Sequence, residues 1–189
     1  MDIVLASQSP RRKELLAGMG LAFTVHPADI REIIPPGLTP QEAVVALSRQ
    51  KAAAVASDFP DSLILAADTI VVLDGRLLGK PRSREEAREM LTALSGRAHR
   101  VCTGFTLQTA ERTESGCEES EVRFRALTGR EIDAYIATGE PMDKAGGYGI
   151  QGLGALLVEG IRGDYFNVVG LPVCRLGMAL KNFGVDCLA

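Results

Sequence analysis

The 189-residue chain is long enough for one large domain or two closely joined lobes, and its 46% hydrophobic residues can fill a sizeable core. Its net charge of −3 creates no general field for nucleic acid or anionic lipid, so any anion-binding site must be a local basic cluster. The four cysteines are far apart in sequence, and together with the two histidines they form no zinc-ligand pattern. We therefore expect the cysteines to be reduced thiols in a cytosolic protein.

The chain carries no recognisable targeting segment. Its first residues have an acid at position 2 and too short an apolar run for a signal peptide, and no segment approaches the length of a membrane span. We therefore expect a cytoplasmic protein with no membrane partner and no nucleic-acid partner.

The first predicted element is a short apolar strand, residues 3–6, followed by a helix. Ser9 is a good N-cap and Pro10 fits the first helical position, so the helix should continue to about Gly18 or Gly20. Arg11 and Arg12 then lie in the first turn, where the helix dipole disfavours cations. A bound phosphate would resolve that conflict; the alternative is two surface arginines without a partner.

A second strand is predicted over residues 22–26, and an acidic loop, residues 29–32, follows it. Glu32 in this loop is a candidate metal ligand, although acids in loops are usually only solvated. Thr39 and Glu42 then form a capping box that starts a helix ending near Ser57.

Lys51 falls on the apolar stripe of that helix, at helical spacing from Leu47 and Val55. A lysine at such a position either extends its ammonium outward to water or faces a polar cleft. The sequence leaves both alternatives open.

The chain is organised around residues 63–81, which begin with a continuous apolar run typical of a strand covered on both faces. Asp68 interrupts this run, and a buried carboxylate requires a cation, a metal or strong donors beside it. Asp74-Gly75 predicts a hairpin turn that would bring Lys80 back towards Asp68. The alternative is that Asp68 caps a break between two strands and Lys80 is solvated.

The following segment alternates capped helices with strands. The predicted features are a capping box at residues 83–86 with a helix closed by Gly96, a strand over 101–107, a polar loop over 111–116, a partner strand with Val122, Phe124 and Ala126 inward, and a capping box at 128–131 with a helix ending at Gly139. This alternation predicts a mixed α/β fold, because the two strands after residue 100 form a hairpin.

A glycine-rich segment, residues 144–154, allows very close approach of its backbone to another group. It contains the pattern G-x-G-x-x-G, but a β-like run over residues 155–158 follows instead of a helix, so we reject a dinucleotide site. A last helix is predicted from Pro172 to about Phe183.

Several stretches together resemble the Maf family of nucleoside triphosphate pyrophosphatases. They are LASQSPRRKELL (5–16), AADTIVVLDGRLLGKP (66–81), SGRAHRVCTGF (95–105), KAGGYGIQGLGA (144–155) and GDYFNVVGLP (163–172). The resemblance covers nearly the whole chain in the expected order, so it implies one Maf-like domain over residues 1–189. It also implies an elongated mixed sheet flanked by helices, with two lobes around a central cleft, similar to inosine triphosphatase.

The resemblance implies hydrolysis of dTTP and UTP to the monophosphate and pyrophosphate with a divalent metal, Mg²⁺ or Mn²⁺. Asp68 matches the acid taken as proton acceptor and metal ligand, and Glu32 matches an acid near the metal. Other positions match residues that line the phosphate cleft, namely Ser7, Arg12, Lys51 and Lys80. Those that match positions linked to base choice are Arg11, Thr69 and Gln151.

Two further alternatives stay open. One is a non-catalytic, nucleotide-sensing regulator of septum formation, since several family members were first connected with cell division; the presence of Asp68 favours the enzyme. The other is a pyrophosphatase that acts mainly on modified nucleotides. Nucleoside triphosphates are the expected small-molecule partners in either case, and a homodimer is one option for an oligomeric state that the sequence does not determine.

Overall fold

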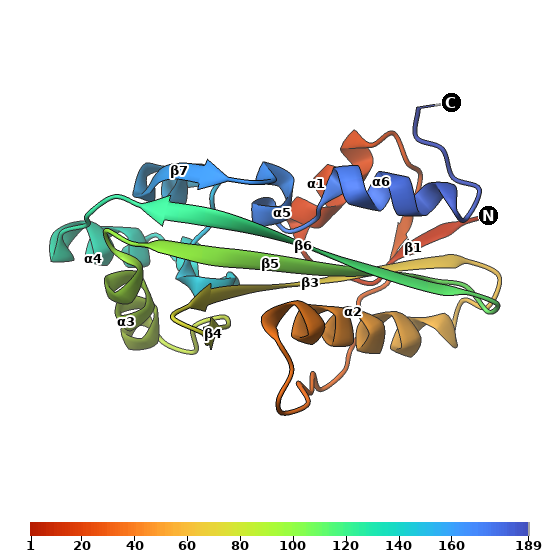
Figure 1. Cartoon of the computed structure of the whole chain (residues 1–189), viewed down its shortest axis with the longest axis horizontal. Helices are drawn as coiled ribbons and strands as arrows, with labels where there is room; N and C mark the ends of the chain where they lie inside the picture. The colour runs from red at the N-terminus through yellow and green to blue at the C-terminus, as the bar shows by residue number, and fades with distance from the viewer. Residues whose placement is uncertain (189) are drawn as a thin grey trace. The chain divides into compact units, whose positions relative to one another are not determined.

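The structure is a computed structural model that describes residues 1–188. It is a mixed α/β fold with helices flanking a seven-stranded sheet of order β2-β1-β3-β5-β6-β7, in which β4 pairs with β3 (Figure 1). This confirms the predicted fold class. The strands are β1 (Ile3–Leu5), β2 (Thr24–Val25), β3 (Leu63–Leu73), β4 (Arg76–Leu78), β5 (Ala98–Gln108), β6 (Thr113–Phe124) and β7 (Val158–Arg162). The helices are α1 (Pro10–Gly18), α2 (Pro40–Ala56), α3 (Arg84–Leu94), α4 (Gly129–Ala137), α5 (Tyr165–Val169) and α6 (Val173–Lys181), with 3₁₀ segments η1 (Glu140–Asp143), η2 (Ala145–Gly147) and η3 (Gly152–Leu157).

The described chain divides into two compact units. Unit 1 comprises Met1–Asp68, Thr103–Glu118 and residues 170–188, and unit 2 comprises Thr69–Cys102 and Glu119–Val169. The long strands β3, β5 and β6 each contribute residues to both units. The single domain over residues 1–189 and the central cleft stay predictions.

Alternate residues of β1 and β3 face two different helical layers in unit 1, because side chains of a strand point to opposite faces in turn. Figure 1 shows α1 and α6 on one side of these strands and α2 on the other. The face towards α1 and α6 buries Ile3, Leu5, Leu63, Leu65 and Ala67. The face towards α2 buries Val4, Ala6, Ile64 and Ala66. Both faces are covered, which explains the continuous apolar sequence of β3.

Helix α2 begins with the predicted capping box and lies unusually close to β5. Thr39 Oγ1 accepts from the Glu42 amide at 3.3 Å, and the Glu42 carboxylate accepts from the Thr39 amide at 2.8 Å. Gly104 of β5 permits the close approach, since a Cβ there would lie 2.6 Å from the carbonyl carbon of Val44. The buried hydroxyls of Ser48 and Thr106 are 2.8 Å apart, so a hydrogen bond also joins helix to strand.

Unit 2 has its own hydrophobic core between the sheet and helices α3 and α4. The strands supply Val71, Leu73, Val101, Val122 and Phe124, and the helices supply Ala87, Leu91, Leu94, Ile132, Tyr135 and Ile136. Both helices therefore bury an apolar face against the strands.

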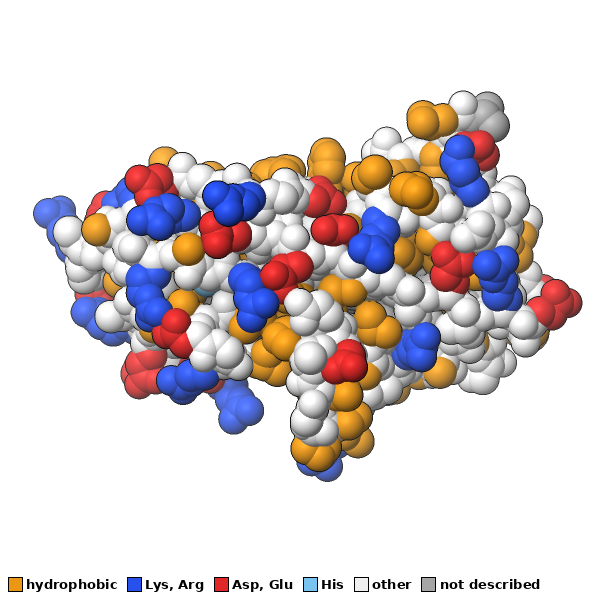
Figure 2. Space-filling view, viewed as in Figure 1, with side chains coloured by type: hydrophobic (Ala, Val, Ile, Leu, Met, Phe, Trp, Pro, Cys, Tyr) orange, Lys and Arg blue, Asp and Glu red, His pale blue; other side chains and the backbone are white. Residues whose placement is uncertain are grey.

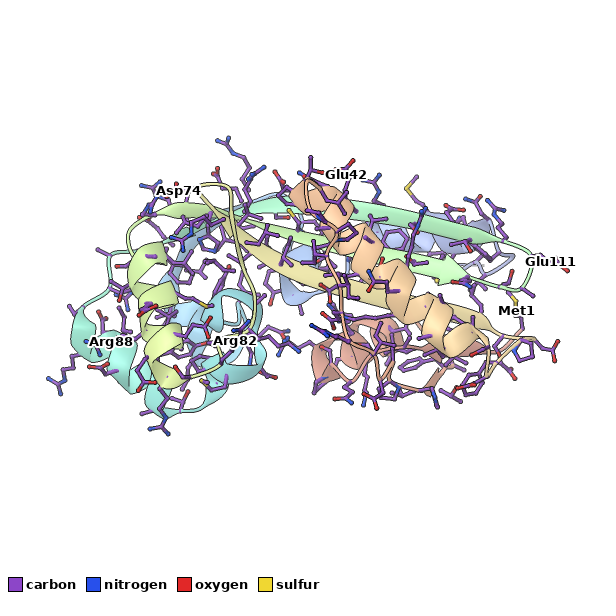
Figure 3. All side chains as sticks on the ribbon, turned by 90° about the horizontal axis from the view of Figure 1, so that it is seen from below. Met1, Glu42, Asp74, Arg82, Arg88 and Glu111 are labelled. Carbon is purple, nitrogen blue, oxygen red and sulfur yellow. The ribbon has the colours of Figure 1, made fainter. Side chains whose placement is uncertain are left out.

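The predicted hairpin after β3 is present in unit 2. Asp74 and Gly75 both adopt positive φ angles, 51° and 77°, as a tight two-residue turn requires. Strand β4 pairs antiparallel with β3, with Val71 opposite Leu78. Arg97 donates to both carboxylate oxygens of Asp74 at 2.7 Å, and Figure 3 shows Asp74 at the tip of this turn.

Four local predictions are wrong. Residues 113–116 belong to β6 rather than to a loop, because the chain already turns between Thr109 and Arg112 and Gly116 packs against the Phe105 ring. Ala126 is exposed, because β6 ends at Phe124 and the Leu127 amide donates to Ser95 Oγ at 2.7 Å.

The other two corrections concern helical segments. Glu86 completes no capping box with Ser83; its carboxylate accepts from the Arg82 amide at 2.6 Å instead. Residues 155–157 are 3₁₀ helix, and the strand begins only at Val158. The sequence also did not predict α5, whose start is marked by Asp164 accepting from the Phe166 amide at 2.8 Å.

No helix within residues 1–188 combines the length and the apolar character that a bilayer span requires. The four cysteines are free thiols. Positive and negative side chains are interspersed over the face shown in Figure 2. The cytoplasmic location stays a prediction.

Candidate active site

Asp68 lies in the unbroken strand β3, so it does not cap a break between two strands. It follows Ile64 and Ala66 at a spacing of two, and its side chain therefore points to the face that α2 covers. Only 13% of that side chain is exposed. A carboxylate in such a position requires a close cation or strong donors.

Lys51 of α2 supplies the cation. Its ammonium contacts Asp68 Oδ1, and its side chain is also only 13% exposed. Lys51 precedes Val55 by one helical turn, on the stripe that packs against β1 and β3. The ammonium therefore contacts acidic groups instead of extending outward to bulk water.

Glu32 joins the same group from the loop between β2 and α2. Its Oε1 lies 2.9 Å from Lys51 Nζ, and 49% of its side chain is exposed. The loop is attached to α2, since Gln50 accepts from the Ile33 amide at 3.1 Å and donates to the Ile33 carbonyl at 2.6 Å. One ammonium is therefore shared by two carboxylates that lie far apart in sequence.

The two carboxylates also fit the requirements of a hard divalent cation. Mg²⁺ is usually held by one or two carboxylates together with substrate phosphates and water, rather than by a complete protein cage. Glu32 and Asp68 provide such a partial set of oxygen ligands. Within residues 1–188, no cluster of three or more Asp, Glu, His or Cys side chains could hold a metal without help.

Ser7 and Arg12 form a second polar group at the start of α1. Ser9 is the N-cap of that helix, as predicted, and its hydroxyl accepts from the Arg12 amide at 3.5 Å. Arg12 Nη1 donates to Ser7 Oγ at 3.2 Å, and Arg12 Nε donates to the Gly170 carbonyl at 2.9 Å. Burial lowers the pKa of Arg12 below its usual value, while the charge of Asp68 opposes that shift. The guanidinium is thereby fixed in orientation and placed in the field of Asp68.

The remaining predicted site residues are divided between the units. Arg11 is half-buried in the first turn of α1 in unit 1. Thr69, Lys80 and Gln151 belong to unit 2, where Thr69 and Gln151 are half-buried and Lys80 is exposed. The approach of Lys80 to Asp68 stays a prediction, as do the roles of all these residues.

Gln151 lies on a tightly folded segment of unit 2. Gly146, Gly147 and Gly152 have φ angles of 70°, 71° and 65°, which L side chains rarely adopt. Gln151 is the residue before η3 and has an extended backbone, with φ −94° and ψ 169°. The predicted close approach of this backbone to other groups is also present, since a Cβ at Gly146 would lie 2.9 Å from Val71 Cγ2.

Sequence reasoning missed three contacts around these groups. They are the Gly170 carbonyl that fixes Arg12, the Ser48–Thr106 hydrogen bond next to Lys51, and the acceptors that hold the glycine-rich segment. None has a local signature, because each joins residues that are distant in sequence.

Comparison with known proteins decides the family. The family model "Maf-like protein" matches residues 2–183. This chain belongs to the Maf family.

Similar curated proteins are bacterial. A dTTP/UTP pyrophosphatase of Moorella thermoacetica is 55% identical over 186 residues, covering 97% of this chain and 96% of that protein. The dTTP/UTP pyrophosphatase of Halalkalibacterium halodurans is 54% identical and covers 96% of this chain and 96% of its own length. That of Bacillus velezensis is 50% identical and covers 97% of each chain.

Similarity to a solved structure is weaker. A HAM1 protein from Coxiella burnetii aligns with 96% of this Maf-family chain and 99% of its own, at 19% identity and a TM-score of 0.49. The inosine-triphosphatase-like part of the predicted fold therefore stays a prediction.

Proposed function

We propose that this chain hydrolyses dTTP and UTP to the nucleoside monophosphate and pyrophosphate. The observation that carries the proposal is the buried Asp68, which is paired with Lys51 beside Glu32. It is supported by similar members of the family that are named dTTP/UTP pyrophosphatase. Nucleoside triphosphates are then its small-molecule partners.

The charges in unit 1 suit a triphosphate. Such a ligand brings about four negative charges, and the cations on these elements, Arg12 and Lys51, can offset part of them. Lys51 can serve the protein both without and with bound triphosphate. Its ammonium contacts carboxylate oxygens in the free protein and can exchange one of them for a phosphate oxygen when the ligand binds. Lys80 is proposed as a further cation for the phosphates.

Asp68 has the properties of a general base. It accepts the proton of the water that attacks the α-phosphorus, while the cations stabilise the charge that develops on the pyrophosphate leaving group. A divalent cation held by Asp68 and Glu32 would supply further charge neutralisation at the phosphates. The contact with Lys51 fixes the orientation of the Asp68 carboxylate.

We propose that Arg11, Thr69 and Gln151 recognise the nucleobase of the substrate. Uracil and thymine present an N3–H donor between two carbonyl acceptors, and the Gln151 amide offers both an acceptor and donors to that edge. Thr69 can adapt its hydroxyl, and Arg11 can donate to a carbonyl oxygen.

A panel of nucleoside triphosphates, with Mg²⁺ and with Mn²⁺, tests the proposal. We expect dTTP and UTP to be converted fastest, with pyrophosphate as a product. Tight binding of nucleotides without turnover by any of them would instead favour the nucleotide-sensing regulator. Faster turnover of a modified pyrimidine triphosphate would favour a pyrophosphatase that acts mainly on modified nucleotides.

A further inference from the structure

The glycine-rich segment of unit 2 is held by two side chains for which the proposed function has no role. Glu140 is the first residue of η1, and Tyr135 lies in α4 and is 5% exposed. The Tyr135 hydroxyl donates to Glu140 Oε1 at 2.9 Å. The two side chains thus form one polar group, which we name the Tyr135–Glu140 pair.

Three backbone amides of the segment donate to this pair. The Gly149 amide donates to the Tyr135 hydroxyl at 3.1 Å. The Leu153 and Gly154 amides donate to the two Glu140 carboxylate oxygens at 3.2 and 3.0 Å. Because Gln151 lies between these donors in sequence, its backbone is tied to the pair on both sides.

The space around the pair is filled as well. A Cβ at Gly154 would lie 2.0 Å from the Gly149 carbonyl oxygen and 2.7 Å from the Tyr135 hydroxyl oxygen. A Cβ at Gly152 would lie 3.0 Å from Glu140 Oε2. The glycines therefore let the backbone close around the pair, and the pair in turn explains why these positions are glycine.

A carboxylate suits this role better than an amide. Glu140 accepts three hydrogen bonds on its two oxygens, and an ionised carboxylate only accepts. Lys144 bonds the backbone carbonyl of Glu140 at 2.7 Å, so the residue is fixed at its main chain too. The result is a rigid support for one specific backbone conformation.

We propose that Glu140 and Tyr135 are positioning residues that hold Gln151 in the orientation needed to read the pyrimidine base. The inference rests on the proposed function and extends it to base selectivity. Hydrogen-bonding sites reject a mismatched ligand strongly only when their polar groups are fixed, so loosening the segment should reduce discrimination more than it reduces phosphate chemistry.

Two variants disrupt the pair in different ways. Glu140→Gln keeps the shape of the side chain but turns one acceptor into a donor, which faces either the Leu153 amide or the Gly154 amide. Tyr135→Phe removes the acceptor of the Gly149 amide and one donor to Glu140. The second variant keeps the test decisive if the first does not fold.

Glu131→Gln is the matched control. Glu131 lies in the same helix, α4, and its carboxylate also accepts three hydrogen bonds, from the Thr128 amide and hydroxyl and from Arg125 Nη2. None of these partners belongs to residues 144–154. A general loss of stability in unit 2 should therefore appear in the control too.

The readout is the ratio of kcat/KM for UTP to kcat/KM for CTP. Cytosine presents an acceptor at N3 and a donor at N4, where uracil presents a donor and an acceptor. We expect Glu140→Gln and Tyr135→Phe to lower this ratio by about 10-fold or more, and Glu131→Gln to leave it within about 2-fold. A folded pair variant with the wild-type ratio would overturn the inference, and so would a wild-type ratio near one.

Hydrogen exchange provides a readout that needs no activity. We expect faster amide exchange across residues 149–154 in both pair variants, with wild-type exchange there in Glu131→Gln. Unchanged protection in the pair variants would contradict the support role directly. If the wild-type protein converted no nucleotide at all, the proposed function would fail while these exchange data would still decide whether the pair holds the segment.

Discussion

Asp68 and Lys51 form the central pair of the candidate site, since the Lys51 ammonium contacts Asp68 Oδ1 and each side chain is only 13% exposed. The apolar run around Asp68 required a buried partner, and the stripe of α2 placed Lys51 on a buried face. Which cation meets which acid depends on how α2 lies on β3. Gly104 and Ser48 bring the same helix close to β5, and neither residue carries a local signal in the sequence.

Asp68→Asn is expected to abolish most activity without unfolding the protein. An asparagine cannot accept the proton of the attacking water, and loss of a general base typically lowers kcat about 10²–10⁴-fold. Lys51 keeps Glu32 as a partner, so it is not left as an isolated buried charge. Steady-state kinetics with UTP and urea unfolding of the same preparation measure both quantities.

Asp58→Asn is the control for that substitution, because 62% of the Asp58 side chain is exposed. It should keep the wild-type kcat. A wild-type kcat in the Asp68 variant would refute the role of Asp68 as the base.

His99 makes the stability of unit 2 depend on pH. The ring is 3% exposed, its Nε2 lies 2.7 Å from the Tyr148 hydroxyl, and burial lowers the pKa of His99 from 6.5 to about 4. Between pH 6.5 and 4, the His99 imidazole therefore binds a proton more tightly in the unfolded chain than in the folded one. The contribution of His99 to stability is complete above pH 6.5 and is lost as the pH falls towards 4.

The size of the effect follows from linkage. One unit of pKa difference is worth about 1.4 kcal/mol, so wild-type protein should lose about 2 kcal/mol through His99 between pH 7 and 5. His99→Gln, which cannot titrate, should show a pH-dependent loss smaller by about that amount in urea unfolding at both pH values. Equal losses in the two proteins would show that His99 does not carry the effect.

At the scale of elements, most helices could be predicted because their ends carry strong local signals. Ser9, Thr39 and Thr128 all cap helices as expected. The extent of β6 and the 3₁₀ character of η3 could not be predicted, because both depend on distant partners. Gly116 accommodates the Phe105 ring, and the amides of η3 bond to Glu140.

The Gly104→Ala variant tests whether the close approach of α2 to β5 determines the position of Lys51. A methyl group at position 104 would lie 2.6 Å from the Val44 backbone, so Gly104→Ala must displace the helix. Overpacking of this kind typically costs about 1–3 kcal/mol of unfolding free energy, and the shift of Lys51 should lower kcat/KM for UTP. Urea unfolding and kinetics measure the two effects.

Gly18→Ala is the matched control, since nothing lies within 4 Å of a Cβ at that helix end. Its stability should stay within about 1 kcal/mol of wild type. Equal behaviour of the two alanine variants would show that the approach of α2 to β5 does not position Lys51.

At the scale of the whole molecule, the sequence resemblance predicted the family and the class of fold, and the comparisons and the seven-stranded sheet confirm both. The function rests on chemistry gathered from distant segments. Strand β3 supplies Asp68, α2 supplies Lys51, and the loop before α2 supplies Glu32. A residue-by-residue pattern could identify these groups, but only the folded chain shows that one ammonium joins the two acids.

In the proposed reaction, water activated by Asp68 attacks the α-phosphorus of a pyrimidine triphosphate. Hydrolysis of UTP in ¹⁸O-labelled water, analysed by mass spectrometry, tests it most directly, because the label marks the phosphorus that was attacked. Attack at the α-phosphorus would leave one labelled oxygen in UMP and the pyrophosphate unlabelled. Label in the pyrophosphate, or UDP with labelled orthophosphate, would contradict it.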